Sequence, residues 1–586
     1  MRRLMERKIL DGLNRLRKNR IYVAVTAVLF PFLIVLLGMC KVNKGLDITD
    51  SAYSCANFKF LDSLDGMWYF STFLANIAGA FLTKLPGGGT FLGLSIYTCI
   101  IKCLIALSAY FFFAYAVKLE KELVFIGEIV AVALCWCPTT ILYNYLTYLF
   151  FFLGATFLLM GIIREKKAWF IIAGIFLGLN VFVRLPNAVE ASLIVCVWFV
   201  AVLKKKKPAV WLSETGWCVL GYVIGFIPGV IGIACGRGFK AYVQGITELM
   251  EMSTEVEGYS TVGMVLAIVR SYVTCYKWLA VTVAVMVVAF LVFRFLPSKL
   301  QLLKYVITTA LALVLLAVLY KMGLFSWQYQ NYGAVYNIGR LMMCLFVILS
   351  IVEIFNPGLT FEERVMAAFS LVIIGITPLG TNNELYTNLN NLFFVAPVCL
   401  MFIVKFVKSA EGVKGIKWVA LVLLAAFAFQ SVLFGTRFVF RDGQDAEMDT
   451  KVAGNTVVAG MYTTADNAER LEAISSIWAD GGYGSGTVLL YGNVSGLGYY
   501  LNTDAAIDTA WPSLASYSTE KFESAMEGLE ASIDNGEVTA PPIIIGLEEY
   551  DFSEPSKKQE ILKSFLDKYD YSESYINDKF VLLLSQ

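Results

Sequence analysis

The chain has 586 residues, of which 58% are hydrophobic and only 16% are charged, and its mean hydropathy is +0.67. This balance excludes a water-soluble protein, because a core of this size cannot bury so much apolar surface, and it makes a lipid bilayer part of the solvent. The net charge of +1 gives no overall basic field for nucleic acid, and the absence of histidine excludes histidine-based zinc sites and Ser-His or Cys-His catalysis.

The first 20 residues form a basic segment, MRRLMERKILDGLNRLRKNR. Its apolar residues recur at helical spacing and predict an amphipathic helix lying on the membrane surface. Basic residues collect on the cytoplasmic side of membrane proteins, so we expect residues 1–20 there. The apolar run 21–40 is long enough to span a bilayer and has no small-residue cleavage site after it, which predicts a retained first span.

Twelve further apolar runs predict, with the first, a polytopic α-helical domain over residues 21–435 with about thirteen transmembrane helices. When the crossings alternate from a cytoplasmic start, the main Lys and Arg clusters between them fall inside, as expected for membrane proteins. The C-terminal region then lies outside, together with the long loops at 41–90, 235–272, 321–339 and 380–390. The twelve runs lie near residues 91–117, 123–140, 141–163, 168–183, 188–203, 209–234, 273–293, 303–320, 340–355, 365–379, 391–407 and 418–435.

Residues 436–586 are hydrophilic and alternate between helical and strand patterns, which predicts an extracytoplasmic, water-soluble α/β domain. Ser556 and Gln559 have the spacing of a capping box at the start of its last helix. The domain has no cysteine, so no disulfide framework is expected. The predicted helices lie near 464–479, 519–534 and 557–569, and the predicted strands span 487–491, 542–545 and 579–584.

The first outer loop, residues 41–90, begins with two carboxylates, Asp47 and Asp50, followed by Tyr53. At three residues apart the carboxylates share one face of a helix or bracket a turn, at the membrane surface. There a carboxylate can deprotonate an acceptor hydroxyl or hold a divalent cation. The alternative is a polar loop start in which an aspartate only caps a helix.

The remainder of this loop, Phe58 to Leu85, mixes apolar, aromatic and polar residues, among them Asp62 and Asp65. This pattern predicts helices lying in the membrane interface. We expect Tyr53, Asp62 and Asp65 to line a lipid-facing cavity that the loop walls.

Arg184 ends a span on the predicted outer side, against the trend that places basic residues inside. A cation there suits an anion such as a lipid phosphate, and snorkelling to ordinary headgroups is the alternative. Arg270 and Arg340 also lie near predicted outer ends, so they are further candidates for the same phosphate site.

Together these features resemble the GT-C superfamily of membrane glycosyltransferases, especially its protein mannosyltransferase and aminoarabinose transferase-like branch. Asp47 and Asp50-Ser51-Ala52-Tyr53 match the acidic motif of the family's first outer loop. Gly178-Leu179 through Arg184-Leu185-Pro186 matches its Gly-Leu-rich span that ends in a basic residue. The family motif is often Asp-Glu, whereas Ser51 follows Asp50 here, so both aspartates stay candidates for the base, with Asp50 favoured by its spacing to Tyr53.

The resemblance implies a transferase that moves a sugar from a polyprenyl phosphate or diphosphate to a glycan, lipid or protein acceptor. Asp50 or Asp47 would take the acceptor's proton, and Arg184 would stabilise the departing phosphate. No cofactor is required in the branch that the chain resembles, although Asp47 and Asp50 could ligate Mg²⁺ or Mn²⁺. The expected location is the outer face of a bacterial plasma membrane.

Two other functions stay open. Many spans with intramembrane charges also suit a secondary transporter or lipid flippase, but no repeat relates the two halves of the chain and the acidic residues gather outside. The third possibility is a non-catalytic membrane assembly protein, whose C-terminal domain binds a partner.

Overall fold

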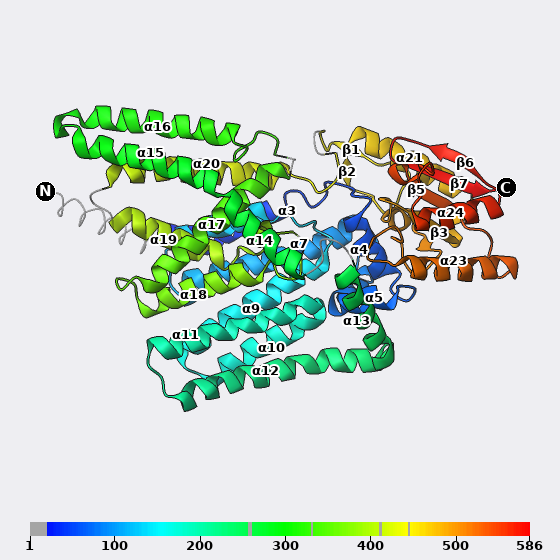
Figure 1. The fold of residues 1–586 in the computed structure, drawn as a ribbon, viewed down its shortest axis with the longest axis horizontal. Helices are drawn as coiled ribbons and strands as arrows, with labels where there is room; N and C mark the ends of the chain where they lie inside the picture. Colours follow the sequence, from blue (N-terminus) through cyan, green and yellow to red (C-terminus); the bar gives the residue numbers. More distant parts are fainter. Residues whose placement is uncertain (1–19, 256–260, 330–331, 382, 410–412, 444–445) are drawn as a thin grey trace.

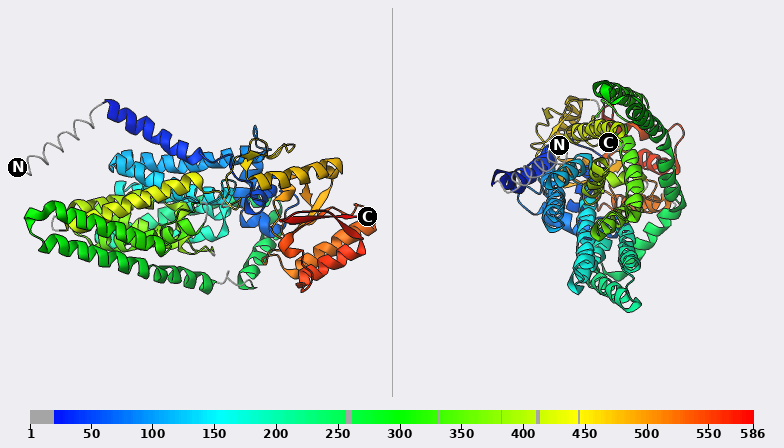
Figure 2. Two further views of the ribbon diagram at one scale, coloured as in Figure 1. Left: turned by 90° about the horizontal axis from the view of Figure 1, so that it is seen from above. Right: turned by 90° about the vertical axis from the view of Figure 1, so that its left-hand side faces the viewer.

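The computed structural model describes residues 20–586, except 256–260, 330–331, 382, 410–412 and 444–445. An elongated helical body occupies one end of the molecule, and a smaller domain containing a sheet occupies the other (Figure 1). The helix expected over residues 1–20 lies outside the described residues except for Arg20, where α2 begins. This first described helix begins at the end of the body far from the C-terminal domain (Figure 2).

Each of the thirteen expected spans coincides with a helix of the body. The first is the continuous run of α2 (Arg20–Ala24), the π-helical η1 (Val25–Leu29) and α3 (Phe30–Met39). The others are α7 (Phe91–Phe111), α8 (Lys121–Leu134), α9 (Leu142–Arg164), α10 (Lys167–Val183), α11 (Val195–Leu203), α12 (Pro208–Cys235), α15 (Tyr276–Phe295), α16 (Gln301–Lys321), α17 (Gly333–Phe355), α18 (Phe361–Ile376), α19 (Val395–Ser409) and α20 (Lys414–Arg437).

Not all of these helices are long enough to cross a bilayer alone. Within the described parts of the chain, nine helices have the length and apolarity of a span, or up to ten if the pair Leu385–Asn391 and Val395–Phe406, bent by 98°, is one broken span. The shorter helices α8, α10, α18 and α19 have 14 to 17 residues, whereas a bilayer core needs about 20. The chain is therefore a multi-pass membrane protein in which several crossings are incomplete helices.

The loops at one end of the body carry short helices of their own. The first loop forms α4 (Asp50–Lys59), α5 (Gly66–Ser71) and α6 (Phe73–Thr83), and α13 (Gly238–Glu255) follows α12. Helix α14 (Thr261–Thr274) instead belongs with α15 to one apolar candidate span of 34 residues, Val262–Phe295. Helix α5 packs on α13. Lys521 of the C-terminal domain bridges both, with its Nζ 3.1 Å from Asp65 Oδ2 and 2.6 Å from Glu248 Oε2. The loops and the C-terminal domain thus form one layer over this end of the body.

The C-terminal domain contains a five-stranded sheet with the strand order β4-β3-β5-β7-β6. Strands β4, β3 and β5 are parallel, whereas β7 runs antiparallel to β5 and β6. The predicted capping box at Ser556 and Gln559 is present. The strands are β3 (Thr487–Tyr491), β4 (Asp504–Ala505), β5 (Ile543–Gly546), β6 (Tyr571–Ile576) and β7 (Phe580–Ser585), and the helices are α21 (Ala465–Asp480), α22 (Leu497–Tyr500), α23 (Thr519–Asp534) and α24 (Lys557–Lys568).

Alternating residues of the sheet pack on its two faces. Leu489 and Ile543 belong to a core shared with α23 and α24. On the other face Leu490 and Ile544 share a core with α21 that continues into the first loop through Ala52, Cys55 and Ala56 of α4. This continuous core holds the first loop and the C-terminal domain together. A separate two-stranded sheet, β1 (Thr450–Lys451) with β2 (Tyr462–Thr463), adds a bridge from Tyr462 to Lys44.

Candidate active site

A cavity of about 1030 Å³ lies at the junction of the helical body, the first loop and the C-terminal domain. Three incomplete helices end at its wall. Helix α8 is followed by Trp136 and Cys137, α10 by Arg184 and its neighbours, and α18 by Thr377 and the segment that leads to the 3₁₀-helix η5 (Leu385–Asn391), and all of these segments line the cavity. Irregular backbone at this depth needs partners other than lipid, and a polar cavity supplies them.

Asp50 is the carboxylate of the first loop that faces this cavity. It is the first residue of α4, and its Oδ2 accepts a hydrogen bond of 2.5 Å from Nη1 of Arg441. The Asp50 side chain remains 35% exposed. Burial and, less strongly, the nearby Asp47 raise the pKa of Asp50 to about 6, and the Arg441 guanidinium opposes that rise. Asp50 is therefore mostly ionised at neutral pH and has acceptor capacity left over.

Asp47 is buried and lies outside the cavity lining. Its Oδ1 accepts from the backbone N–H of Thr49 at 2.9 Å and from the Thr49 hydroxyl at 2.5 Å, and its Oδ2 accepts from the N–H of Ser51 at 2.8 Å. These are the donors that a chain entering a helix leaves without partners. Asp47 thus holds the turn that presents Asp50.

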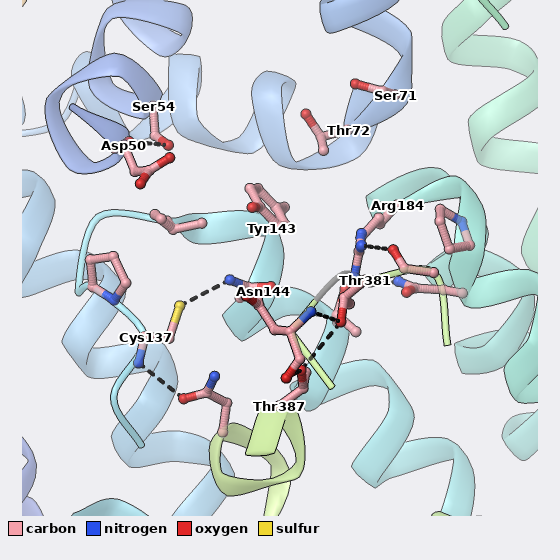
Figure 3. Close-up of a pocket in the computed structure, with 18 of the residues that line it drawn as sticks. Asp50, Ser54, Ser71, Thr72, Cys137, Tyr143, Asn144, Arg184, Thr381 and Thr387 are labelled. Atoms are coloured by element: carbon pink, nitrogen blue, oxygen red, sulfur yellow. Dashed lines mark hydrogen bonds between the residues drawn. The ribbon is translucent and has the colours of Figure 1, made fainter. Parts of the chain in front are cut away.

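Arg184 lines the cavity at the end of α10, and Figure 3 shows it on a different wall from Asp50. Its Nη2 donates to the carbonyl oxygen of Gly380. Gly380 has φ +75°, and a Cβ there would collide with Pro186, so glycine permits this close turn. Arg184 keeps further donors for a ligand, since a guanidinium has five.

The other two predicted cations lie away from the cavity lining. Arg340 pairs with Glu384 at 2.9 Å and donates to Asn337 at 3.2 Å, which ties α17 to the turn before η5. Arg270 lies exposed on α14. The structure therefore brings Arg184 to the same cavity as Asp50 and leaves Arg270 and Arg340 out.

Of the three predicted first-loop lining residues, Tyr53 faces the cavity, packed edge-on against Trp511 of the C-terminal domain with ring centroids 5.5 Å apart. Asp65 caps α5 by accepting from the N–H of Met67 at 2.8 Å and pairs with Lys521. Asp62 contributes a carbonyl oxygen to Arg237. Neither Asp62 nor Asp65 belongs to the lining, and Asp65 instead contacts the C-terminal domain through Lys521.

Sequence reasoning missed Arg441, which follows the last span as Arg184 follows an earlier one. The backbone around it is fixed: Arg441 has φ +44°, and the next residue, Asp442, is buried. Asp442 accepts from the N–H of Leu46 at 2.5 Å, from the Thr463 hydroxyl at 2.7 Å and from the amide of Asn467. A basic residue just after the last predicted span, on its predicted outer side, was the signal that could have identified Arg441.

The rest of the lining is rich in neutral polar and aromatic groups, which suits a ligand with many hydroxyls. Tyr336 and Tyr386 stack at 3.8 Å between ring centroids, and Trp136 packs edge-on against Tyr336. Besides Phe440 and Arg441, four residues of the C-terminal domain complete the wall: Asn493, Trp511, Leu514 and Ser516.

No group of three or more Cys, Asp or Glu side chains with the arrangement of a metal site occurs in the described part of the chain. Asp47 and Asp50, the two residues considered for a divalent cation, are engaged by backbone donors and by Arg441 respectively.

The fold and this site define a class: a multi-pass α-helical membrane protein with a polar cavity under a C-terminal domain. No known family model and no curated protein matches the chain. Among solved structures, it is similar to the oligosaccharyltransferase AglB from Archaeoglobus fulgidus in complex with an inhibitory peptide and a dolichol-phosphate, at 12% identity over 89% of this chain and 69% of that one, with a TM-score of 0.45. It is also similar to ArnT from Cupriavidus metallidurans bound to undecaprenyl phosphate, at 10% identity over 95% and 97% of the two chains, with a TM-score of 0.41.

Proposed function

We propose that this protein is a glycosyltransferase that takes a sugar from a polyprenyl-phosphate donor and passes it to an acceptor on the outer face of a bacterial plasma membrane. One observation carries the proposal: the same cavity contains a partly exposed carboxylate, Asp50, and, on another wall, a cation, Arg184. A secondary transporter needs a site near the bilayer midplane, whereas this cavity lies at the end of the helical body, under the C-terminal domain.

Asp50 is the general base of the proposed reaction. Its carboxylate takes the proton of the acceptor hydroxyl while the hydroxyl oxygen forms a bond to the anomeric carbon of the sugar. The bond from that carbon to the phosphate oxygen breaks, and its electron pair leaves with the phosphate. Because the pKa of Asp50 is about 6, the base is ionised at neutral pH and still accepts a proton readily.

Arg184 binds the phosphate of the donor and stabilises the charge that develops on it. The aromatic and amide groups between the two walls hold the sugar, and the four C-terminal residues of the lining contact the acceptor. The leaving group is already an anion, so the reaction needs no general acid, which suits a chain without histidine.

The test is a turnover assay on the full chain in detergent, with a panel of undecaprenyl-phosphate-linked and diphosphate-linked sugars and with membrane lipids, glycans and peptides as acceptors. Asp50→Asn and Arg184→Gln are compared with wild type. The matched controls are Asp62→Asn, an aspartate of the same loop outside the cavity lining, and Arg270→Gln, an exposed outer arginine.

We expect wild type and both controls to release undecaprenyl phosphate or diphosphate, and each cavity variant to lose about 10²- to 10⁴-fold in rate. If both cavity variants turn over at the wild-type rate, the reaction takes place at another site. Absence of turnover and of prenyl-lipid binding across the whole panel would favour a transporter or an assembly protein.

A further inference from the structure

Arg441 and Asp50 form an ion pair that the proposed reaction must break. The base can take a proton only by losing its negative charge, and Arg441 then loses its partner. Their shared bond is short, 2.5 Å, yet both side chains are partly open, with 49% of Arg441 and 35% of Asp50 exposed. Among the described residues, the only other oxygen that accepts from the Arg441 guanidinium is the Thr49 hydroxyl, 3.3 Å from Nη1, in a weak hydrogen bond.

The backbone of Arg441 is anchored by its neighbour, whereas nearly half of its side chain is exposed. Asp442 is clamped by three donors, as described above, and the guanidinium lies 5.3 Å from the ring of Phe440. The guanidinium can therefore move within the cavity without any movement of the chain that carries it.

The net charge of the cavity lining bears on the number of phosphates in the donor. Four charged side chains line it among the described residues: Asp50, Arg184, Glu190 and Arg441. Asp50 and Arg441 cancel, so whichever form Glu190 takes, the net charge is +1 or zero. A sugar joined to a lipid through one phosphate carries one negative charge, and a diphosphate link carries two.

We propose that Arg441 serves two partners in turn, Asp50 before the reaction and the departing phosphate after it. This inference rests on the proposed function. The sugar carbon–oxygen bond to the phosphate breaks, and the phosphate changes from a diester with one charge to a monoester with two. The acceptor proton moves to Asp50, which becomes neutral. One unit of negative charge thus passes from Asp50 to the phosphate. Arg441 then pairs with this new charge, while Arg184 stays paired with the charge that the phosphate already had in the donor.

Binding of undecaprenyl phosphate, the monoester product, tests this exchange without turnover. Asp50→Asn imitates the protonated base and releases Arg441, so we expect it to bind undecaprenyl phosphate about tenfold tighter than wild type does. Arg441→Gln should bind it more weakly than wild type. The variant that combines Asp50→Asn and Arg441→Gln should bind no tighter than Arg441→Gln alone, because the gain in affinity depends on Arg441. Arg441→Lys, which keeps the charge, should retain part of the gain in the Asp50→Asn background and shows that a loss in Arg441→Gln is not misfolding.

Undecaprenyl diphosphate is the second probe. We expect wild type to bind it no tighter than the monophosphate. If undecaprenyl phosphate binds wild type and Asp50→Asn equally, or if the gain survives without Arg441, the exchange of partners is wrong although the proposed function stands. A tenfold preference for the diphosphate would overturn the step above, in which a single phosphate departs. If neither lipid binds wild type or Asp50→Asn, the proposed function itself fails, and this inference with it.

Discussion

Two neighbouring regions of the molecule use the same residue types for different purposes. At the junction between the first loop and the C-terminal domain, Asp47 and Asp442 are buried, and each accepts three hydrogen bonds from protein donors. Asp50 follows Asp47 by three residues, and Arg441 directly precedes Asp442. At the cavity, Asp50 and Arg441 share one short bond and remain partly exposed. The number of donors around a carboxylate therefore separates the structural Asp47 and Asp442 from Asp50, the aspartate available for chemistry.

The electrostatics of the two regions agree with this division. Burial raises the pKa of Asp47 and of Asp442, and the hydrogen bonds that each carboxylate accepts oppose the rise. A carboxylate with three donors has little capacity left for an acceptor's proton, whereas Asp50 has a pKa of about 6 and accepts one side-chain hydrogen bond from the described residues, on Oδ2.

The largest expected effect separates the two aspartates of the first loop. Asp50→Asn should lower turnover by about 10²- to 10⁴-fold, because it removes the base, and should leave the unfolding midpoint in detergent unchanged. Asp47→Asn replaces one acceptor oxygen by an amide that donates, so it should lower the midpoint, with turnover reduced only in proportion to the folded fraction. Rates normalised to folded protein and thermal unfolding of the same samples make the comparison. Equal loss of normalised rate in both variants would contradict the division.

The next effect concerns the clamp of the junction. Asp442→Asn leaves at least one of three buried donors facing an amide N–H, which should cost about 2–3 kcal/mol. We expect faster hydrogen exchange at the Leu46 amide and a lower unfolding midpoint. Glu554→Gln, an exposed acid of the same domain, is the control and should change neither. An unchanged Leu46 amide would show that the junction does not depend on Asp442.

A smaller effect appears in the pH dependence. Activity needs ionised Asp50, so the rate of wild type should fall as the pH drops through about 6, the pKa of Asp50. Arg441 favours the ionised form, and Arg441→Gln should therefore move this acid limb upward by about one pH unit. Rates measured from pH 4.5 to 8.5 with Arg441→Lys as the control check the sign. A limb that moves downward, or does not move, would mean that Arg441 does not act on the base.

Much of the fold could be predicted from the sequence because the apolar runs and their basic ends follow from the bilayer. The thirteen expected helices are present, and so are the three strands of the C-terminal domain near 487–491, 542–545 and 579–584. The prediction missed β6, since its pattern YSESYI is largely polar and it lies at the sheet edge, paired with β7. The sequence already shows that several apolar runs are short. Hydropathy cannot predict that three of the short helices, α8, α10 and α18, end at one cavity.

The site was predictable only in part. Asp50, Tyr53 and Arg184 lie at the cavity, whereas Asp62, Asp65, Arg270 and Arg340 face elsewhere. Sequence spacing favoured Asp50 over Asp47 only slightly, because the donors that engage Asp47 come together only when the loop has folded. Arg441 lies 391 residues from Asp50 along the chain, and no local pattern joins them.

The smallest expected effect tests a cation that, like the junction aspartates, is fully engaged. Lys558, in the first turn of α24, donates from its Nζ to the carbonyl oxygens of Pro512 and Leu514, both at 2.8 Å, and of Tyr517. These bonds hold the segment that carries Trp511 and Leu514 to the cavity wall. Lys558→Met removes the three donors and should raise KM for the acceptor about threefold, with kcat within twofold, because the segment binds and takes no part in proton transfer. The control is Lys568→Met on the same helix, whose exposed pairs with Glu530 and Asp534 lie away from the cavity. A fall in kcat at constant KM would instead place this segment among the groups that act in the transition state.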